Sequence, residues 1–228
     1  MEKIEDFNWG WMNDPSPTAK FHRESITREI FIDKLYEKYN EVKEGDIVLD
    51  IGASVGPFSY SIIDKNPQQV FCIEPSDSEF LTLTENLSKR NNVTLINKGI
   101  STVNSIVNSD MLFGGESQMQ GITFKSLIDE YNIEKIDFLK TDCEGGEYDI
   151  FNIENMVWLK QNLQTAVGEW HLSTPELKQK FRAFRDVYLR LFPTHEVCAV
   201  DGTDIKWDLW NEHFIEYYNE VIIYIDNR

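Results

Sequence analysis

The chain has 228 residues, 41% of them apolar and 27% charged, which is enough for one well-filled globular core. Acidic residues outnumber basic residues 39 to 22, and the net charge of −17 argues against a nucleic-acid partner, because phosphate backbones are bound mainly through Lys and Arg. No apolar run approaches the roughly 18 residues of a membrane span and residues 1–20 lack a signal-peptide pattern, so we expect a cytoplasmic protein with no membrane partner.

The first predicted elements lie ahead of the sheet. Residues 26–39 predict a helix with apolar side chains on or near one face. Before this helix, long aromatic side chains stand beside Gly and Pro. Residues 1–25 therefore predict an N-terminal lid, with Trp9 and Trp11 as candidate substrate contacts.

Short runs rich in β-branched and apolar residues predict the strands. Seven such runs occur, at residues 46–51, 69–74, 93–97, 136–141, 165–170, 195–200 and 220–225. Helical stretches separate the first three, and this alternation is typical of a parallel sheet covered by helices on both faces. We predict an α/β fold with a seven-stranded, mostly parallel sheet, whose last two strands could pair as a hairpin. No linker is apparent, so residues 1–228 are expected to form a single domain.

The sequence VLDIGASVGPF, at residues 48–58, has the form of a nucleotide-binding turn. Glycine lets the backbone approach a ligand closely, and a helix follows directly. The spacing differs from the dinucleotide pattern G-x-G-x-x-G, and Asp50 in the turn suits a cofactor with an ammonium group, such as S-adenosylmethionine. The next strand ends at Glu74, where an acid can accept hydrogen bonds from ribose hydroxyls. The candidate cofactor-binding residues are Asp50, Gly52, Ala53, Ser54, Gly56, Phe58, Glu74 and Pro75. The alternative is that the glycines only shape a tight turn.

The sequence FLKTDCEGGEYDIF, at residues 138–151, places four carboxylates within eight positions at the end of a buried strand. Ligands bind beyond the carboxyl ends of parallel strands, so Asp142 should face the same crevice as the glycine turn. Side chains alternate along a strand, which makes Lys140 the expected charge partner within this acidic group. Glu144 and Glu147 could either stabilise the start of the next helix or serve the site.

Three stretches, VLDIGASVGPF, VFCIEPS and above all IDFLKTDCEGGEYDIF, resemble the FkbM family of S-adenosylmethionine-dependent methyltransferases. The most specific part is K-x-D-x-E-G-x-E, represented here by Lys140, Asp142, Glu144, Gly145 and Glu147. Glu169 and His171, at the end of the following strand, also fit the family. The resemblance covers residues 26–171. It implies a class I methyltransferase fold, Rossmann-like in its sheet, and methylation of hydroxyls on sugars or natural products.

Methyl transfer to a hydroxyl needs close positioning and a base that takes the proton. The candidate catalytic residues are Asp142, His171 and Glu169. We predict Asp142 or His171 as the base, with Glu169 orienting His171 or binding a substrate hydroxyl. The candidate substrate-binding residues are Lys140, Glu144, Trp9 and Trp11. We predict no metal; if one binds, Asp142 and Glu169 are its expected ligands.

The sequence therefore predicts an S-adenosylmethionine-dependent O-methyltransferase acting on a hydroxyl of a sugar, glycan or natural product. Residues 172–228 are expected to shape the substrate pocket, and their Trp207, Trp210 and Phe214 fit either pocket or core. One alternative is a nicotinamide-dependent oxidoreductase, which the missing third glycine and Asp50 disfavour. Another is a binding module that keeps the cofactor fold without catalysis. Methylation of nucleic acid is disfavoured by the net charge.

Overall fold

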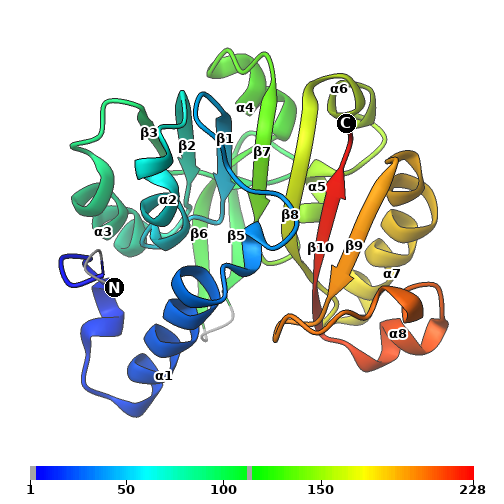
Figure 1. Cartoon of the computed structure of the whole chain (residues 1–228), viewed down its shortest axis with the longest axis horizontal. Coiled ribbons are helices and arrows are strands. Elements are labelled where there is room, and N and C mark those ends of the chain that lie inside the picture. Colours follow the sequence, from blue (N-terminus) through cyan, green and yellow to red (C-terminus); the bar gives the residue numbers. More distant parts are fainter. Residues whose placement is uncertain (1–3, 112–114) are drawn as a thin grey trace.

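One large β-sheet runs through the molecule, which is described by a computed structural model at residues 4–111 and 115–228 (Figure 1). In spatial order, its seven strands are β3 (Val93–Ile96), β2 (Gln69–Ile73), β1 (Ile47–Ile51), β7 (Ile136–Thr141), β8 (Leu163–His171), β10 (Glu220–Asp226) and β9 (Thr194–Cys198). The first five are parallel, whereas β10 runs antiparallel to both of its neighbours. The predicted α/β fold with a seven-stranded, mostly parallel sheet is confirmed.

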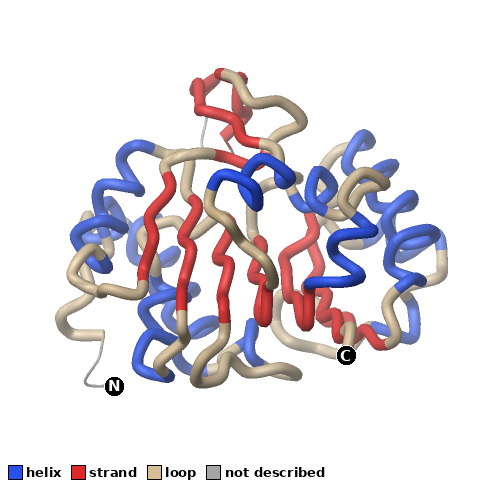
Figure 2. Tube along the Cα trace, turned by 90° about the horizontal axis from the view of Figure 1, so that it is seen from above, coloured by secondary structure: helices blue, strands red, loops and turns tan. Residues whose placement is uncertain are grey.

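Helices cover both faces of this sheet (Figure 2), because successive residues of a strand point to opposite sides. In β2, Val70 and Cys72 join one core cluster, whereas Phe71 and Ile73 join the other. The first cluster includes residues of α2 (Pro57–Ile62) and α3 (Asp77–Leu87). The second includes residues of α4 (Phe124–Glu130), α5 (Glu147–Ile150), α6 (Met156–Asn162), α7 (Pro175–Ala183) and α8 (Glu212–Tyr217). Burial on both faces explains the continuous apolar runs in the sequence.

The segment before β1 does not form the single helix predicted over residues 26–39. Instead α1 (Pro17–Ile26) ends there, and the chain continues as a π-helix, η2 (Thr27–Ile32), and a 3₁₀ turn, η3 (Leu35–Glu37). Between these two, Lys34 has a left-handed φ of 50°, which interrupts the helical path. The interruption lets Tyr36 turn into the protein, where it is buried. Figure 1 shows α1 beyond the carboxyl ends of the parallel strands.

A second, three-stranded sheet was not predicted. It contains β4 (Gly99–Ile100), β6 (Gly115–Ile122) and β5 (Ile106–Met111), with β4 parallel and β5 antiparallel to β6. These strands carry Ser, Asn, Gln and Glu in place of the apolar runs of the large sheet. The remaining short turns are η1 (Gly10–Asn13), η4 (Ile63–Lys65), η5 (Phe184–Tyr188), η6 (Leu189–Leu191) and η7 (Lys206–Asp208). Among the helices of the described residues, none is long and apolar enough to span a bilayer.

The C-terminal aromatic residues do not share one environment. Phe214 is fully buried in the core, whereas Trp207 is 78% exposed and Trp210 is 40% exposed. β9 and β10 pair antiparallel as a hairpin would, but residues 199–219 between them contain η7 and α8. This long connection places α8 against α7 at the edge of the sheet.

Candidate active site

The predicted acidic residues come together because the parallel strands end at one edge of the sheet. Asp50 lies in β1, Glu74 follows β2, Asp142 follows β7 and Glu169 lies near the end of β8. The antiparallel β10 adds a further acid at this edge, because its first residue, Glu220, pairs with the last residue of β8. Five carboxylates from five strands therefore surround one edge, which is where open α/β sheets bind ligands.

The glycine turn after β1 can be built only with glycine at two positions. Gly52 and Gly56 have φ values of 75° and 90°, which side chains rarely adopt. A Cβ on Gly52 would lie 1.7 Å from the carbonyl oxygen of Asp142, and a Cβ on Gly56 would lie 2.7 Å from Leu83 Cδ1. The missing side chains let the turn pack tightly against the residue that follows β7 and against α3.

Asp50 and Lys140 form a buried ion pair beneath this turn. They are partners in the β1–β7 register, and Asp50 Oδ1 lies 3.2 Å from Lys140 Nζ. Asp50 Oδ2 also accepts a hydrogen bond of 2.7 Å from Ser59, and Lys140 donates one of 2.7 Å to the carbonyl of Gly52. Burial alone would lower the pKa of Lys140, but the charges of Asp50 and Asp142 outweigh it and raise that pKa. Lys140 was predicted to pair within the acidic group of residues 142–149, but its ion pair is with Asp50 of β1.

This burial leaves little surface on several predicted ligand-binding side chains. Asp50 is 0% exposed and Lys140 is 4% exposed, so each can influence a ligand only through the turn that it supports. Phe58 is 2% exposed and stacks on Phe138 with ring centroids 5.8 Å apart. Phe58 is therefore a core residue, because it lies in the first turn of α2 on the side that faces the sheet.

Glu74 is held by two backbone N–H groups at the end of β2. Ser54 N donates to its Oε2 at 2.8 Å, and Ser76 N donates to its Oε1 at 2.7 Å. Burial raises the pKa of Glu74 to about 7, and the negative charge of Glu79 adds to this effect. The carboxylate thus joins the glycine turn to the first turn of α3, and it has the location predicted for a ribose-binding acid.

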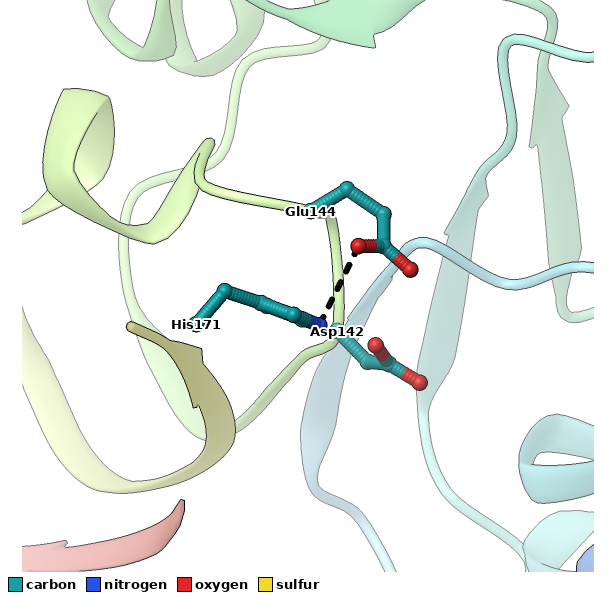
Figure 3. Close-up of side chains that lie close together, drawn as sticks. All are labelled: Asp142, Glu144 and His171. Carbon is teal, nitrogen blue, oxygen red and sulfur yellow. Dashed lines mark ion pairs between the residues drawn. The ribbon is translucent and has the colours of Figure 1, made fainter. Parts of the chain in front are cut away.

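His171 lies among carboxylates at the ends of β7 and β8, and Figure 3 shows it beside Asp142 and Glu144. Its Nδ1 is 3.1 Å from Oε1 of Glu147, which is fully buried. Its Nε2 is 3.3 Å from Glu144 Oε2 and 3.6 Å from Glu169 Oε1. Burial would lower the pKa of His171, but the hydrogen bond to Glu147 and the surrounding negative charges raise it to about 10. The imidazole therefore carries a proton at neutral pH, which removes it as a base in this state.

Glu147 connects the loop after β7 with His171. It is the first residue of α5, and its Oε1 accepts a hydrogen bond of 3.1 Å from the backbone of Cys143. The same oxygen contacts His171. The carboxylate therefore fixes the loop after β7 and the ring of His171 together, which resembles the way that buried acids orient histidines in enzyme sites.

Two further residues of the site come from the segment before β1. Tyr36 is buried, donates a hydrogen bond of 3.3 Å to Asp142 Oδ2 and lies with its ring 5.4 Å from Lys140 Nζ. Burial raises the pKa of Glu29, in the π-helix, to about 7, and the charge of Asp142 adds to this rise. Sequence reasoning missed both residues. In the sequence, their one signal was a polar side chain within the apolar pattern of a predicted helix. The sequence gives no such signal for the π-helix, which turns Glu29 inwards.

Among the residues that the structure describes, two groups of side chains could hold a metal ion. Ligand atoms of Asp142, Glu144 and His171 lie within 4.8 Å of one another, as do those of Glu169, His171 and Glu220. The two residues predicted as metal ligands, Asp142 and Glu169, fall into different groups, and His171 belongs to both. A metal at either place would have to displace the proton that His171 carries.

The N-terminal aromatic residues lie on the glycine-turn side of the site. Trp9 is 5% exposed and packs with Phe7, Met12 and Val55, so it offers a substrate almost no surface. Trp11 is 44% exposed, and its Nε1 donates a hydrogen bond of 3.2 Å to Glu79 in α3. Residues 8–11 of the predicted lid therefore contact α3, whereas α1 lies beyond the carboxyl ends of the parallel strands; residues 1–3 lie outside the described part of the chain.

Comparison with known proteins gives a family for most of this site. A family model described as the methyltransferase FkbM domain matches residues 50–192, which is more than half of the chain. A curated relative, Methyltransferase 1 of Beauveria bassiana (strain ARSEF 2860), is 32% identical over 77 residues. That match covers 33% of this chain and 30% of the relative, so the chain spans less than a third of the relative's length.

Several solved structures share the fold. Methyltransferase FkbM from Methylobacillus flagellatus KT matches with a TM-score of 0.54 and 15% identity, over 86% of this chain and 47% of that one. Fibrillarin from Aeropyrum pernix, with natively bound S-adenosyl-L-methionine, has a TM-score of 0.50 and 14% identity, over 84% and 71%. A putative rRNA-methylase from Clostridium thermocellum has a TM-score of 0.50 and 13% identity, over 90% and 96%. At these identities the likeness concerns the fold alone, and it confirms the predicted class I methyltransferase architecture.

Proposed function

We propose that this chain, which belongs to the FkbM methyltransferase family, transfers the methyl group of S-adenosylmethionine to a hydroxyl of a sugar, a glycan or a natural product. The observation that carries the proposal is the contact between the glycine turn and Asp142. The space above the Gly52 Cα is closed by the carbonyl oxygen of Asp142, so the two backbones touch. A cofactor bound on the turn would present its reactive end next to Asp142, and such placement supplies much of the acceleration in group transfer.

The residues present fit this cofactor. Gly52 and Gly56 let the turn adopt left-handed backbone angles at the start of α2, and Glu74 offers carboxylate oxygens to ribose hydroxyls. When bound, S-adenosylmethionine supplies an electrophilic methyl group. Asp50 and Lys140 hold the turn from below and do not need to touch the ligand.

A hydroxyl acceptor suits the acidic side of the site. Carboxylates accept hydrogen bonds from hydroxyls, and Asp142, Glu144 and Glu169 come from two neighbouring strand ends. Asp142 is proposed as the base, because its Oδ2 is already fixed by Tyr36 and the carboxylate can take a proton with its other oxygen. Glu169 and Glu144 are proposed to bind further hydroxyls of the acceptor.

The alternatives are less well supported. A nicotinamide cofactor would place a pyrophosphate on a turn that contains a buried acid and lacks the G-x-G-x-x-G spacing. A nucleic-acid acceptor is opposed by the net charge of −17 and by the carboxylates that line the site. A non-catalytic binding module would have no need for Asp142 to lie against the cofactor turn.

The first test is calorimetric titration of the purified protein with S-adenosylmethionine, S-adenosylhomocysteine and NADH, repeated on Glu74→Ala. We expect micromolar binding of both adenosyl ligands, weakened by the substitution, and no binding of NADH. Binding of NADH alone would overturn the proposal. Transfer of labelled methyl groups to hydroxyl-bearing acceptors, with and without excess chelator, then tests the reaction and any need for a metal.

The same assay tests the proposed base. Asp142→Asn keeps the size and one acceptor oxygen of the side chain but cannot take a proton. We expect turnover to fall at least about 100-fold, the lower end of what a general base contributes, while cofactor affinity stays within a few-fold. Unchanged turnover would remove Asp142 from the mechanism.

A further inference from the structure

We propose that Glu79 is a second ribose-binding carboxylate of the cofactor site, and that Trp11 is the residue that positions it. The inference rests on the proposed function, because it assigns these residues to the same adenosyl cofactor. Both residues lie on the glycine-turn side of the crevice, and neither was a cofactor candidate in the sequence.

Glu79 shares a small polar site with Glu74. Ser76 is the N-cap of α3: its backbone N–H donates to Glu74, and its side chain accepts a hydrogen bond from the backbone of Glu79 at 3.5 Å. The charge of the Glu79 carboxylate helps to raise the pKa of Glu74. Ser76 thus links the two acids, because it contacts Glu74 through its backbone and the backbone of Glu79 through its side chain.

The chemistry that suits this pair is a vicinal diol. Both oxygens of Glu74 already accept a backbone N–H, which limits what it can offer a ligand. A ribose presents two adjacent hydroxyls, and each can donate one hydrogen bond. With Glu74 taking one hydroxyl, Glu79 on the adjacent turn is placed to take the other.

Trp11 fixes the carboxylate of Glu79 from the N-terminal segment. The indole Nε1 donates to Glu79 Oε1 at 3.2 Å. The segment is anchored to α3 by Asn8 and Asn86, which exchange two hydrogen bonds of 3.0 and 2.9 Å, and Asn86 also binds the carbonyl of Val55 in the glycine turn. Gly10 lies so close to α3 that a Cβ there would meet Thr82 Oγ1 at 3.0 Å. The indole therefore has a fixed place beside the turn.

The N-terminal segment lies outside the part of the chain that the family model matches, which begins at residue 50. Its described contacts include Glu79, which Trp11 binds, and Val55, against which Trp9 packs, and both of these lie on the cofactor side. Trp11, which the sequence predicted as a substrate contact, is thus assigned to the cofactor site.

The test measures binding of S-adenosylhomocysteine and of its 2′-deoxy and 3′-deoxy analogues by calorimetry. We expect Glu79→Gln to weaken S-adenosylhomocysteine about 10-fold, as for loss of a charge-assisted hydrogen bond, and to leave unchanged the affinity for the analogue that lacks the hydroxyl bound by Glu79. The matched control is Glu85→Gln on the same helix, whose carboxylate accepts a bond of 2.6 Å from Asn8 of the same segment. Its affinity should stay within about two-fold of the unsubstituted protein.

Trp11→Phe keeps an aromatic ring and removes the N–H donor. It should weaken binding of S-adenosylhomocysteine several-fold and, like Glu79→Gln, leave unchanged the affinity for the analogue that lacks the hydroxyl bound by Glu79. Equal affinities of the Glu79 and Glu85 variants would overturn the inference, as would a loss in Glu79→Gln that is the same for all three ligands. If the unsubstituted protein bound no adenosyl ligand, the proposed function itself would fall, and that result is distinct from either of these.

Discussion

Replacement of Lys140 by Met should destabilise the protein strongly, because it leaves a buried carboxylate without a partner. Asp50 is 0% exposed and would keep Ser59 as a donor while losing the ammonium group 3.2 Å away. Removing one member of a buried ion pair costs about 3–5 kcal/mol. The carbonyl of Gly52 would also lose the hydrogen bond of 2.7 Å from Lys140, within the same coupled group. For a chain of this size, 3–5 kcal/mol corresponds to a fall in melting temperature of about 6–20 °C.

The assay is urea unfolding followed by circular dichroism, with thermal melts as a second measure. Lys125→Met is the control, because Lys125 pairs with Asp129 on the surface, with side-chain exposures of 77% and 63%, and such pairs contribute at most about 0.5 kcal/mol. Asp50→Asn combined with Lys140→Met removes the unpaired charge and should restore at least half of the lost stability. A loss below about 1 kcal/mol in Lys140→Met, or no recovery in the double variant, would refute the reasoning.

Three further predictions concern the turn, Glu74 and His171. Gly52→Ala should destabilise the protein by several kcal/mol more than Gly45→Ala, because both positions have a left-handed φ but only the Cβ at Gly52 meets another atom within 4 Å; equal losses in urea unfolding would contradict this. The pKa of Glu74 is raised from 4.5 to about 7 in the fold, so its contribution to stability is complete below pH 4.5 and is lost as the pH rises through 7. Glu74→Gln should therefore reduce the fall in the free energy of unfolding between pH 5 and pH 8 by up to about 3 kcal/mol. Identical pH profiles of the two proteins would show the reasoning to be wrong. Glu147→Gln should lower the pKa of His171, which is about 10, by at least about one unit. An NMR titration of the imidazole measures this pKa, and His171→Gln identifies its signal. An unchanged titration would mean that Glu147 does not hold the proton on His171.

The large sheet could be predicted because its strands are buried on both faces. Val70 to Ile73 of β2, for example, all face apolar neighbours, and this gives the sequence an unbroken apolar run. The small sheet could not be predicted, because β5 and β6 carry many polar residues and therefore lack the apolar, β-branched runs by which strands are recognised. The helix over residues 26–39 was wrong because a π-helix and the left-handed Lys34 preserve an apolar pattern while changing its path.

The candidate site could be predicted only where a residue's role follows from its place at a strand end. Glu74 and Asp142 fall into this class. Tyr36 does not, because its contact with Asp142 joins positions 106 residues apart, and Glu79 depends in the same way on a contact with Trp11, 68 residues away. Phe58 was predicted to bind the cofactor because of its place in the motif. The spacing alone could not show that Phe58 lies on the face of α2 that packs against Phe138.

The protonation states around His171 decide which residue can act as the base in the proposed reaction. The pKa of His171 is raised to about 10, and burial with the charge of Asp142 raises the pKa of Glu169 well above its usual value. His171 therefore holds a proton near neutral pH, and the buried Glu169 loses its proton less readily than an exposed glutamate does, so we favour Asp142 as the base. Burial and the nearby carboxylates also raise the pKa of Tyr36, so its hydroxyl stays a donor to Asp142. We propose that His171 acts in this reaction as a fixed positive charge among carboxylates: while Asp142 takes the proton of the acceptor, the imidazolium would stabilise negative charge that develops on the acceptor oxygen.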